Sequence, residues 1–212
     1  MNPRPTTFTF QRYLSAKRTV DDRALNHDVW QTLHRLLAAR AQAHQPLTIL
    51  EIGGGIGTMV ERLLEGGRLP SVQYHLLDEQ AENIDEAYRR LATFAAGTPR
   101  TSAFQIAPTH SLSIPQPSGA TVDLHLYTGD LFEFLASAGS LANVDLLLAH
   151  AFMDLVDIPA TLPRFTATLT PGALIYFTIN FDGATILEPT IDTAFDAHVE
   201  QVYHRTMDER IT

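Results

Sequence analysis

Four glycines lie close together after one apolar run of this chain. The stretch LTILEIGGGIGTMVERLLEGG places four of the 12 glycines at Gly53, Gly54, Gly55 and Gly57. A turn that leaves a strand sharply and brings a ligand against the backbone needs residues without a Cβ. Because packing alone rarely requires glycine at four such positions, the stretch predicts a ligand-binding loop at the carboxyl end of a buried strand. A glycine-rich helix entry without a ligand is the alternative.

The spacing of these glycines excludes two common nucleotide-binding loops. The sequence does not match the dinucleotide fingerprint G-x-G-x-x-G. A fingerprint that began at Gly53 would need glycine at position 58, which is Thr58, and one that began at Gly55 would need glycine at position 60, which is Val60. A P-loop fails too, because no Gly-Lys-Ser/Thr follows. The turn has instead the form acidic-x-Gly-x-Gly-x-Gly, which begins at Glu51.

Acidic residues also follow the next two predicted strands. Asp78 lies 25 positions after Gly53 and is followed by Glu79, near the spacing of about 20 at which a ribose-binding acid occurs in nucleotide folds. Asp130 ends the run YTGD and precedes Leu131. Each acid has an alternative role as the N-cap of the following helix.

In this order, the motifs resemble those of the class I S-adenosylmethionine-dependent methyltransferases, over roughly residues 45–182. The resemblance implies S-adenosyl-L-methionine as the cofactor and SN2 transfer of its methyl group to an O, N or C nucleophile of a small or medium-sized molecule. A non-catalytic S-adenosylmethionine-binding protein on the same scaffold is the alternative. The implied cofactor residues are Glu51 at the amino group, Gly53, Gly55 and Gly57 in the loop, Asp78 or Glu79 at the ribose, and Asp130 with Leu131 at the adenine. For Glu51 the alternative is a structural acceptor for the amides of the glycine loop.

The resemblance also implies that the methyl group points toward the ends of the fourth and fifth strands. His150 is the candidate catalytic base there, since it titrates near neutral pH, or it packs against the cofactor. Asn180 and Asp182 are further catalytic candidates, and they alternatively form the turn NFDG. Asp154 is a candidate substrate or lid residue. A metal-dependent site could be made of Asp154, Asn180 and Asp182. Their spacing is not distinctive of such a site, so we predict no metal.

A polar segment, YLSAKRTVDDRALN, precedes the predicted sheet. Leading helices of small-molecule methyltransferases commonly close over the cofactor and substrate, so Tyr13, Lys17 and Arg23 are candidate lid or substrate residues. A Lys or Arg from this segment could meet the methionine carboxylate. The alternative is a solvated helix face.

Strand-like and helix-like segments alternate along the chain and predict an α/β fold, a three-layer Rossmann-like sheet that is mostly parallel. We divide the chain into a tail and lid helix (1–45), a cofactor-binding core (46–190) and a helical C-terminal segment (191–212). The segment 98–120 is predicted as a long connection, with a short strand or a helical turn of its own as the alternative. The predicted strands are 47–52, 72–78, 121–130, 144–152 and 172–181, and the predicted helices are 21–42, 58–67, 81–97, 131–139, 160–170 and 191–212.

The methyltransferase sheet has seven strands in the order 3-2-1-4-5-7-6, and only five are predicted here. The fifth, 172–181, is nearly continuous apolar sequence, which a strand buried on both faces needs. As an edge it would expose unpaired backbone groups. We therefore expect further chain, a partner strand or a homo-oligomer to cover it.

The overall composition is ordinary for one globular domain, with 212 residues and 18% charged residues. A net charge of −9 makes nucleic acid an unlikely partner. No apolar run approaches the ~18 residues of a membrane span, so no membrane partner is expected. The chain has no cysteines and no signal-peptide pattern at its start, which is compatible with a cytoplasmic enzyme.

Overall fold

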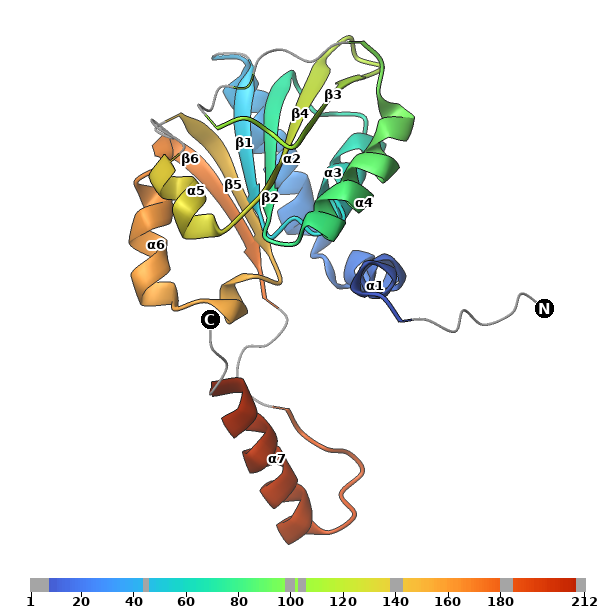
Figure 1. The fold of residues 1–212 in the computed structure, drawn as a ribbon, viewed down its shortest axis with the longest axis vertical. Coiled ribbons are helices and arrows are strands. Elements are labelled where there is room, and N and C mark those ends of the chain that lie inside the picture. Colours follow the sequence, from blue (N-terminus) through green and yellow to red (C-terminus); the bar gives the residue numbers. More distant parts are fainter. Residues whose placement is uncertain are drawn as a thin grey trace, which may run out of the picture.

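The computed structural model describes residues 8–43, 46–97, 102, 106–137, 143–179 and 185–208. Within them, six strands form one sheet with helices on both faces, which confirms the predicted three-layer α/β class (Figure 1). The strand order is β3-β4-β2-β1-β5-β6, and every neighbouring pair is parallel except β3 with β4. The strands are β1 (Leu47–Ile52), β2 (Val72–Asp78), β3 (His110–Pro115), β4 (Thr121–Thr128), β5 (Val144–His150) and β6 (Leu169–Thr178).

The central strand β1 lies between β2 and β5, at the point where the strand order reverses. In open α/β sheets, ligands bind beyond the carboxyl ends of the strands at this point. The glycine loop leaves β1 there and leads into α3. The helices are α1 (Phe10–Ala24), α2 (His27–Ala41), α3 (Thr58–Glu65), α4 (Ala81–Leu91), α5 (Leu131–Ser137), α6 (Ile158–Thr166) and α7 (Thr193–Asp208), with short 3-10 turns η1 (Ala92–Phe94) and η2 (Met153–Leu155).

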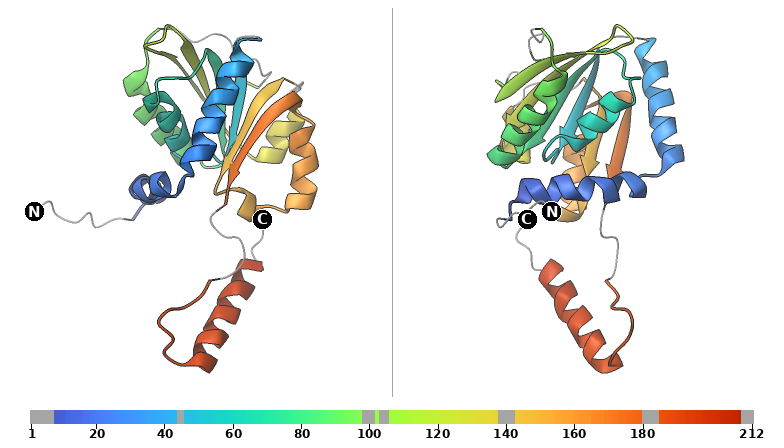
Figure 2. Two further views of the ribbon diagram at one scale, coloured as in Figure 1. Left: turned by 180° about the vertical axis from the view of Figure 1, so that it is seen from behind. Right: turned by 90° about the vertical axis from the view of Figure 1, so that its right-hand side faces the viewer.

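The sheet is buried on both faces at its centre, where β1 and β5 are mostly apolar. Ile49 belongs to the core cluster that α2, α3 and α4 cover, whereas Leu50 belongs to the cluster under α5 and α6. Ile49 and Leu50 are both fully buried. Successive residues of a strand point to opposite faces, so a continuous apolar run fits a strand with helices on both sides. Figure 2 shows these two helical layers from behind and from the side.

Several predicted bounds differ from those of the structure. The strand predicted over 172–181 is β6, which begins at Leu169, and the helix predicted over 160–170 is α6, which ends at Thr166. The helix predicted over 21–42 is two helices, because Asn26 interrupts it and caps α2 by accepting hydrogen bonds from the backbone of Asp28 and Val29. The segment predicted as a connection contains β3, in which the buried Leu112 and Ile114 alternate with polar residues. The serines and prolines of this segment are typical of a loop, but the alternation of apolar and polar residues is typical of a strand.

The last strand, β6, pairs with β5 and is an edge strand of the sheet that the structure describes. Its Ile175 is 44% exposed. In Figures 1 and 2, α7 lies outside the three layers. The expectation that further chain or a partner covers this edge stays a prediction.

No described helix combines the length and the apolar composition that crossing a membrane requires.

Two histidines lie side by side inside the sheet. His75 of β2 and His125 of β4 are register partners, and their rings stack with centroids 5.1 Å apart. Both are almost fully buried, and Nδ1 of His75 lies 3.0 Å from the Tyr127 hydroxyl. Burial lowers the pKa of both imidazoles, and for His75 the neighbouring His125 lowers it further. The pair is therefore neutral at neutral pH.

We predict that His75→Phe flattens the pH dependence of stability. Because the folded state lowers the pKa of His75 below the ordinary value of 6.5, the unfolded chain binds more protons in acid. The stability contributed by neutral His75 is thus present above pH 6.5 and lost as pH falls below it, by up to about 1.4 kcal/mol per pH unit. Urea unfolding between pH 5 and pH 8 measures this slope. His198→Phe, on the exposed surface of α7, is the control, and equal slopes for wild type and His75→Phe would contradict the prediction.

Candidate functional site

A cavity of about 160 Å³ lies at the carboxyl ends of β1, β5 and β6, which we call the β1 cavity. The glycine loop and α3 form one side of it, and α1 closes it from outside. Four residues predicted for the site meet here: Glu51, Gly53, His150 and Lys17. The complete lining is Lys17, Asp21, Ala24, Leu25, Glu51, Gly53, Gly54, Thr58, Met59, Arg62, His150, Ala151, Thr178 and Ile179.

Packing within the protein requires glycine at two positions of the loop. A Cβ on Gly54 would lie 2.4 Å from Cγ of Leu76, and one on Gly57 would lie 2.9 Å from Cδ1 of Leu91. Gly57 also has a φ of +78°, which disfavours any residue with a Cβ. At these positions, the structural alternative to a ligand-binding role explains the sequence.

The other two glycines face side chains that cover the loop. A Cβ on Gly53 would lie 2.7 Å from Cδ2 of Phe152, and one on Gly55 would lie 3.2 Å from Cδ1 of Leu14 on α1. Both glycines have positive φ, +63° and +54°. A ligand that approaches the backbone of Gly55 therefore meets α1 first.

Asp78 holds the glycine loop in place. Its Oδ2 accepts a hydrogen bond from the Gly55 backbone at 2.8 Å. Its Oδ1 accepts from the backbone of Gln80 at 3.0 Å and from Nδ2 of Asn83 at 2.9 Å. A carboxylate has about four lone-pair sites, so one acceptor position is left for a ligand. The ribose role of Asp78 stays a prediction, as does that of Glu79, which is exposed beside it.

Asp130 has the capping role that was its alternative. Its Oδ1 accepts hydrogen bonds from the backbone of Phe132 at 2.8 Å and Glu133 at 2.9 Å, at the start of α5. Asp130 is exposed, and the next residue, Leu131, is buried in the core under α5. Both lie at the end of β4 and do not line the β1 cavity. Their contact with adenine stays a prediction.

Glu51 is a buried carboxyl group at the end of β1. It is 2% exposed, and the Tyr74 hydroxyl donates a hydrogen bond to it at 2.6 Å. Burial raises the pKa of Glu51 to about 7, although the hydrogen bond from Tyr74 and the charge of Arg62 both oppose the shift. A cationic group in the cavity would favour the ionised form, since an opposite charge lowers the pKa of a carboxyl group.

Arg62 is a site residue that the sequence did not predict. Its Nε donates to Asp22 of α1 at 2.5 Å, whereas its buried Nη2 has no hydrogen-bond partner among the described residues. The side chain is only 10% exposed. A buried donor without a partner costs free energy, so this nitrogen favours an anionic ligand group. No signal in the sequence pointed to it, because Thr58, the cavity residue one turn before it on α3, was not predicted for the site either.

His150 lies at the end of β5 against the same cavity. Its Nδ1 is 3.0 Å from Oγ1 of Thr178, and its buried Nε2 has no partner within the part of the chain that the structure describes. Burial lowers the pKa of His150 to about 4, and the charge of Arg62 contributes to the shift. The imidazole is therefore neutral at physiological pH.

Other predicted residues do not line the cavity. Tyr13 is 47% exposed and stacks on Phe10, and Arg23 and Asp154 are exposed. Asn180 and Asp182 lie outside the described residues. Among the residues that are described, no group of three or more histidine or carboxylate side chains is arranged to hold a metal ion.

No family model and no curated protein matches this sequence. The structure is similar to several solved methyltransferases, and it spans about half the length of the first of them. The plantazolicin methyltransferase BpumL in complex with SAH has 19% identity and a TM-score of 0.44 over 78% of this chain and 51% of that one. A methyltransferase from Geobacter sulfurreducens has 16% identity and a TM-score of 0.44 over 84% of this chain and 73% of that one.

We predict that Glu51→Gln stabilises the protein at alkaline pH. The folded state raises the pKa of Glu51 from 4.5 to about 7, so the wild type loses stability as pH rises through this window. Glutamine keeps the shape and has no proton to lose. The stability difference between variant and wild type should therefore grow to about 3 kcal/mol between pH 5 and pH 8. Urea unfolding at both pH values measures it, with the exposed Glu133→Gln as the control. A pH-independent difference would disprove the shift.

Proposed function

We propose that the protein is an S-adenosylmethionine-dependent methyltransferase. The observation that carries the proposal is a pair of groups that line the β1 cavity, the buried carboxyl of Glu51 and a guanidinium nitrogen of Arg62 that has no partner among the described residues. An α-amino acid carries an ammonium and a carboxylate, and these groups complement Glu51 and Arg62 respectively. The methionine end of S-adenosylmethionine has this structure. The cavity adjoins a glycine loop whose spacing disfavours dinucleotides.

The residues present fit the cofactor in charge and position. Glu51 would bind the amino group and Arg62 the carboxylate, while Gly55 would bring the backbone close and Asp78 would offer its remaining acceptor position to the ribose. The cofactor supplies an activated methyl group on its sulfonium. The protein then has to align an acceptor and exclude water.

His150 is placed to orient that acceptor. In the tautomer whose Nδ1 donates to Thr178, Nε2 of this cavity-lining residue keeps a lone pair and can accept a hydrogen bond from an O–H or N–H group. A pKa of about 4 makes it a weak proton acceptor, so we assign it an orienting role before that of a general base. Asn180 and Asp182 remain proposed partners of the acceptor.

A non-catalytic protein that binds S-adenosylmethionine is the second candidate. It would keep the pair Glu51 and Arg62 without transferring a methyl group. Incubation of the protein with methyl-labelled S-adenosylmethionine and a metabolite extract separates the two, because only the enzyme produces a labelled product. A small or medium-sized acceptor and a cytoplasmic location remain predictions.

We predict that the protein binds S-adenosylhomocysteine at low-micromolar Kd and does not bind NAD. Glu51→Gln and Arg62→Gln should each weaken this binding by about 1–3 kcal/mol, the scale of a lost hydrogen bond to a charged group. Calorimetry measures these affinities. The matched probe is 5′-methylthioadenosine, which lacks the amino acid, so its affinity should change little in either variant.

The two probes also separate recognition from disturbance of the site. Equal losses for both ligands would mean that the variants distort the cavity rather than remove contacts with the amino acid. Glu133→Gln is the control for a charge change on the exposed surface. Binding of NAD without binding of S-adenosylhomocysteine would refute the proposed function.

A further inference from the structure

The carboxyl group of Glu51 is held by a hydroxyl group from the neighbouring strand. Leu76 of β2 is the register partner of Glu51, and Tyr74, two positions earlier, lies on the same face of the sheet. The side chain of Tyr74 is fully buried, and its hydroxyl donates to Oε2 of Glu51 at 2.6 Å. No described residue donates to Oε1 of Glu51. One oxygen of this cavity-lining carboxyl is therefore fixed, and the other keeps its lone pairs for a ligand.

The amides of the glycine loop use acceptors other than Glu51. The amide of Gly54 donates to the carbonyl of Leu77 at 3.1 Å. The amide of Gly55 donates to Oδ2 of Asp78 at 2.8 Å. These two bonds leave no structural role for Glu51 at either amide. A buried carboxyl that the loop does not need is available to a ligand in the β1 cavity.

The Tyr74 hydroxyl acts on Glu51 as a donor. Burial raises the pKa of Tyr74 well above its ordinary value, and the charge of Glu51 raises it further, so the phenol keeps its proton. A hydrogen bond donated to a carboxylate favours the ionised form. Burial raises the pKa of Glu51, the bond from Tyr74 opposes this shift, and the resulting value is about 7. The carboxyl of the free protein is therefore partly protonated at neutral pH.

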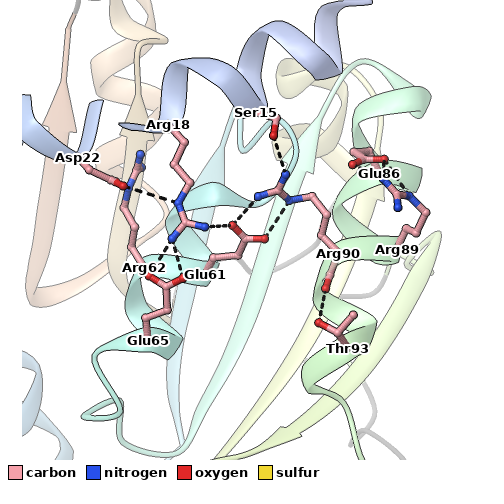
Figure 3. A network of polar contacts seen from close by, with 10 residues as sticks. All are labelled: Ser15, Arg18, Asp22, Glu61, Arg62, Glu65, Glu86, Arg89, Arg90 and Thr93. Atoms are coloured by element: carbon pink, nitrogen blue, oxygen red, sulfur yellow. Dashed lines mark hydrogen bonds and ion pairs between the residues drawn. The ribbon is translucent and has the colours of Figure 1, made fainter. Parts of the chain in front are cut away.

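Charged groups on other elements also act on Glu51. The charge of Arg62 on α3 lowers its pKa, and that of Asp78 at the end of β2 raises it. Asp22 of α1 accepts from Nε of Arg62 and fixes this guanidinium within the network of Figure 3. A zwitterion with its carboxylate at Arg62 leaves its ammonium to be balanced by the carboxylate of Glu51. Three further titratable residues line the same cavity, namely Lys17 and Asp21 on α1 and His150 on β5.

We propose that Tyr74 is a positioning residue, which fixes Oε2 of Glu51 so that Oε1 receives the ammonium group of an α-amino acid ligand, and that this ligand displaces a proton from Glu51. The proton leaves the carboxyl group for the solvent, and the ligand keeps all three protons of its ammonium group. The inference rests on the proposed function for the identity of the ligand. Affinity for the amino acid end then rises with pH as Glu51 ionises, and a buried hydroxyl group sets the pH at which this happens.

Calorimetry of S-adenosylhomocysteine binding in buffers of different ionisation enthalpy counts the displaced protons. About 0.9 proton per ligand should be released at pH 6 and about 0.1 at pH 8, as for a group with a pKa of about 7 that is ionised in the complex. The affinity should rise about tenfold between these pH values. Glu51→Gln has no proton to release, so its affinity should be equal at both. Binding by the wild type without proton release at pH 6 would overturn the proposal.

Tyr74→Phe keeps the ring and removes the donor. The pH of half-maximal proton release should then rise by about one pH unit, the scale of a lost hydrogen bond to a charged group. Affinity for S-adenosylhomocysteine at pH 7 should fall about fivefold, whereas affinity for 5′-methylthioadenosine should not change. Tyr127→Phe is the matched control, because Tyr127 is also buried in the sheet and its hydroxyl lies at His75. An unchanged pH midpoint in Tyr74→Phe, or an equal shift in Tyr127→Phe, contradicts the proposal.

A second substitution tests the same bond if Tyr74→Phe does not fold. 3-Fluorotyrosine at position 74 keeps the hydrogen bond and makes the phenol a stronger donor, so the pH midpoint should fall below that of the wild type. Infrared titration of the ligand-free protein follows the carboxyl stretch that Glu51→Gln removes, and this titration should shift in the same direction. A carboxyl titration that does not respond to the fluorine overturns the role of Tyr74. If it responds but S-adenosylhomocysteine does not bind, the role of Tyr74 is supported and the proposed function is contradicted.

Discussion

The site depends on how closely the glycine loop lies against the sheet and the neighbouring helix. Gly54 lies directly on Leu76 of β2 and Gly57 on Leu91 of α4, with no room for a Cβ at either position. The loop therefore follows one path from β1, and α3 begins at one place and in one orientation. This contact accordingly fixes the direction of Glu61 and Arg62, whose charges act at the cavity and at α1.

Two consecutive residues of α3 have different electrostatic surroundings. Glu61 is neutralised by Arg90 of α4 and Arg18 of α1. Arg62 has one acidic partner, Asp22, and one buried nitrogen without a partner among the described residues. In a poorly solvated place, an unsatisfied guanidinium nitrogen attracts an anion more strongly than it would in water. The same helix thus carries one charged residue whose hydrogen bonds are satisfied and one that keeps an unsatisfied nitrogen at the cavity.

Burial also favours the uncharged forms of two other cavity residues, Glu51 and His150. Burial raises the pKa of Glu51 and lowers that of His150, because the charged form of either group loses its hydration. The ligand-free cavity thus limits buried charge around Arg62. A zwitterion would bring its own ammonium and carboxylate and would favour the ionised form of Glu51. The electrostatics of the free cavity are therefore consistent with an amino acid as the ligand.

The sequence by itself determined the elements whose signals are local. Strands β1 and β2 have the bounds that their apolar runs predicted. The glycine loop and Glu51 lie at the carboxyl end of β1, where they were expected. Asp130 shows the limit of such local signals, because an acidic residue after a strand is equally typical of a cofactor ligand and of a helix N-cap. Tertiary structure alone decided the role of Arg62, because it depends on the path of the glycine loop and on Asp22, 40 positions away. It also set the direction of α1 ahead of the break at Asn26, since ion pairs with α3 hold α1 in a direction that its own sequence does not specify.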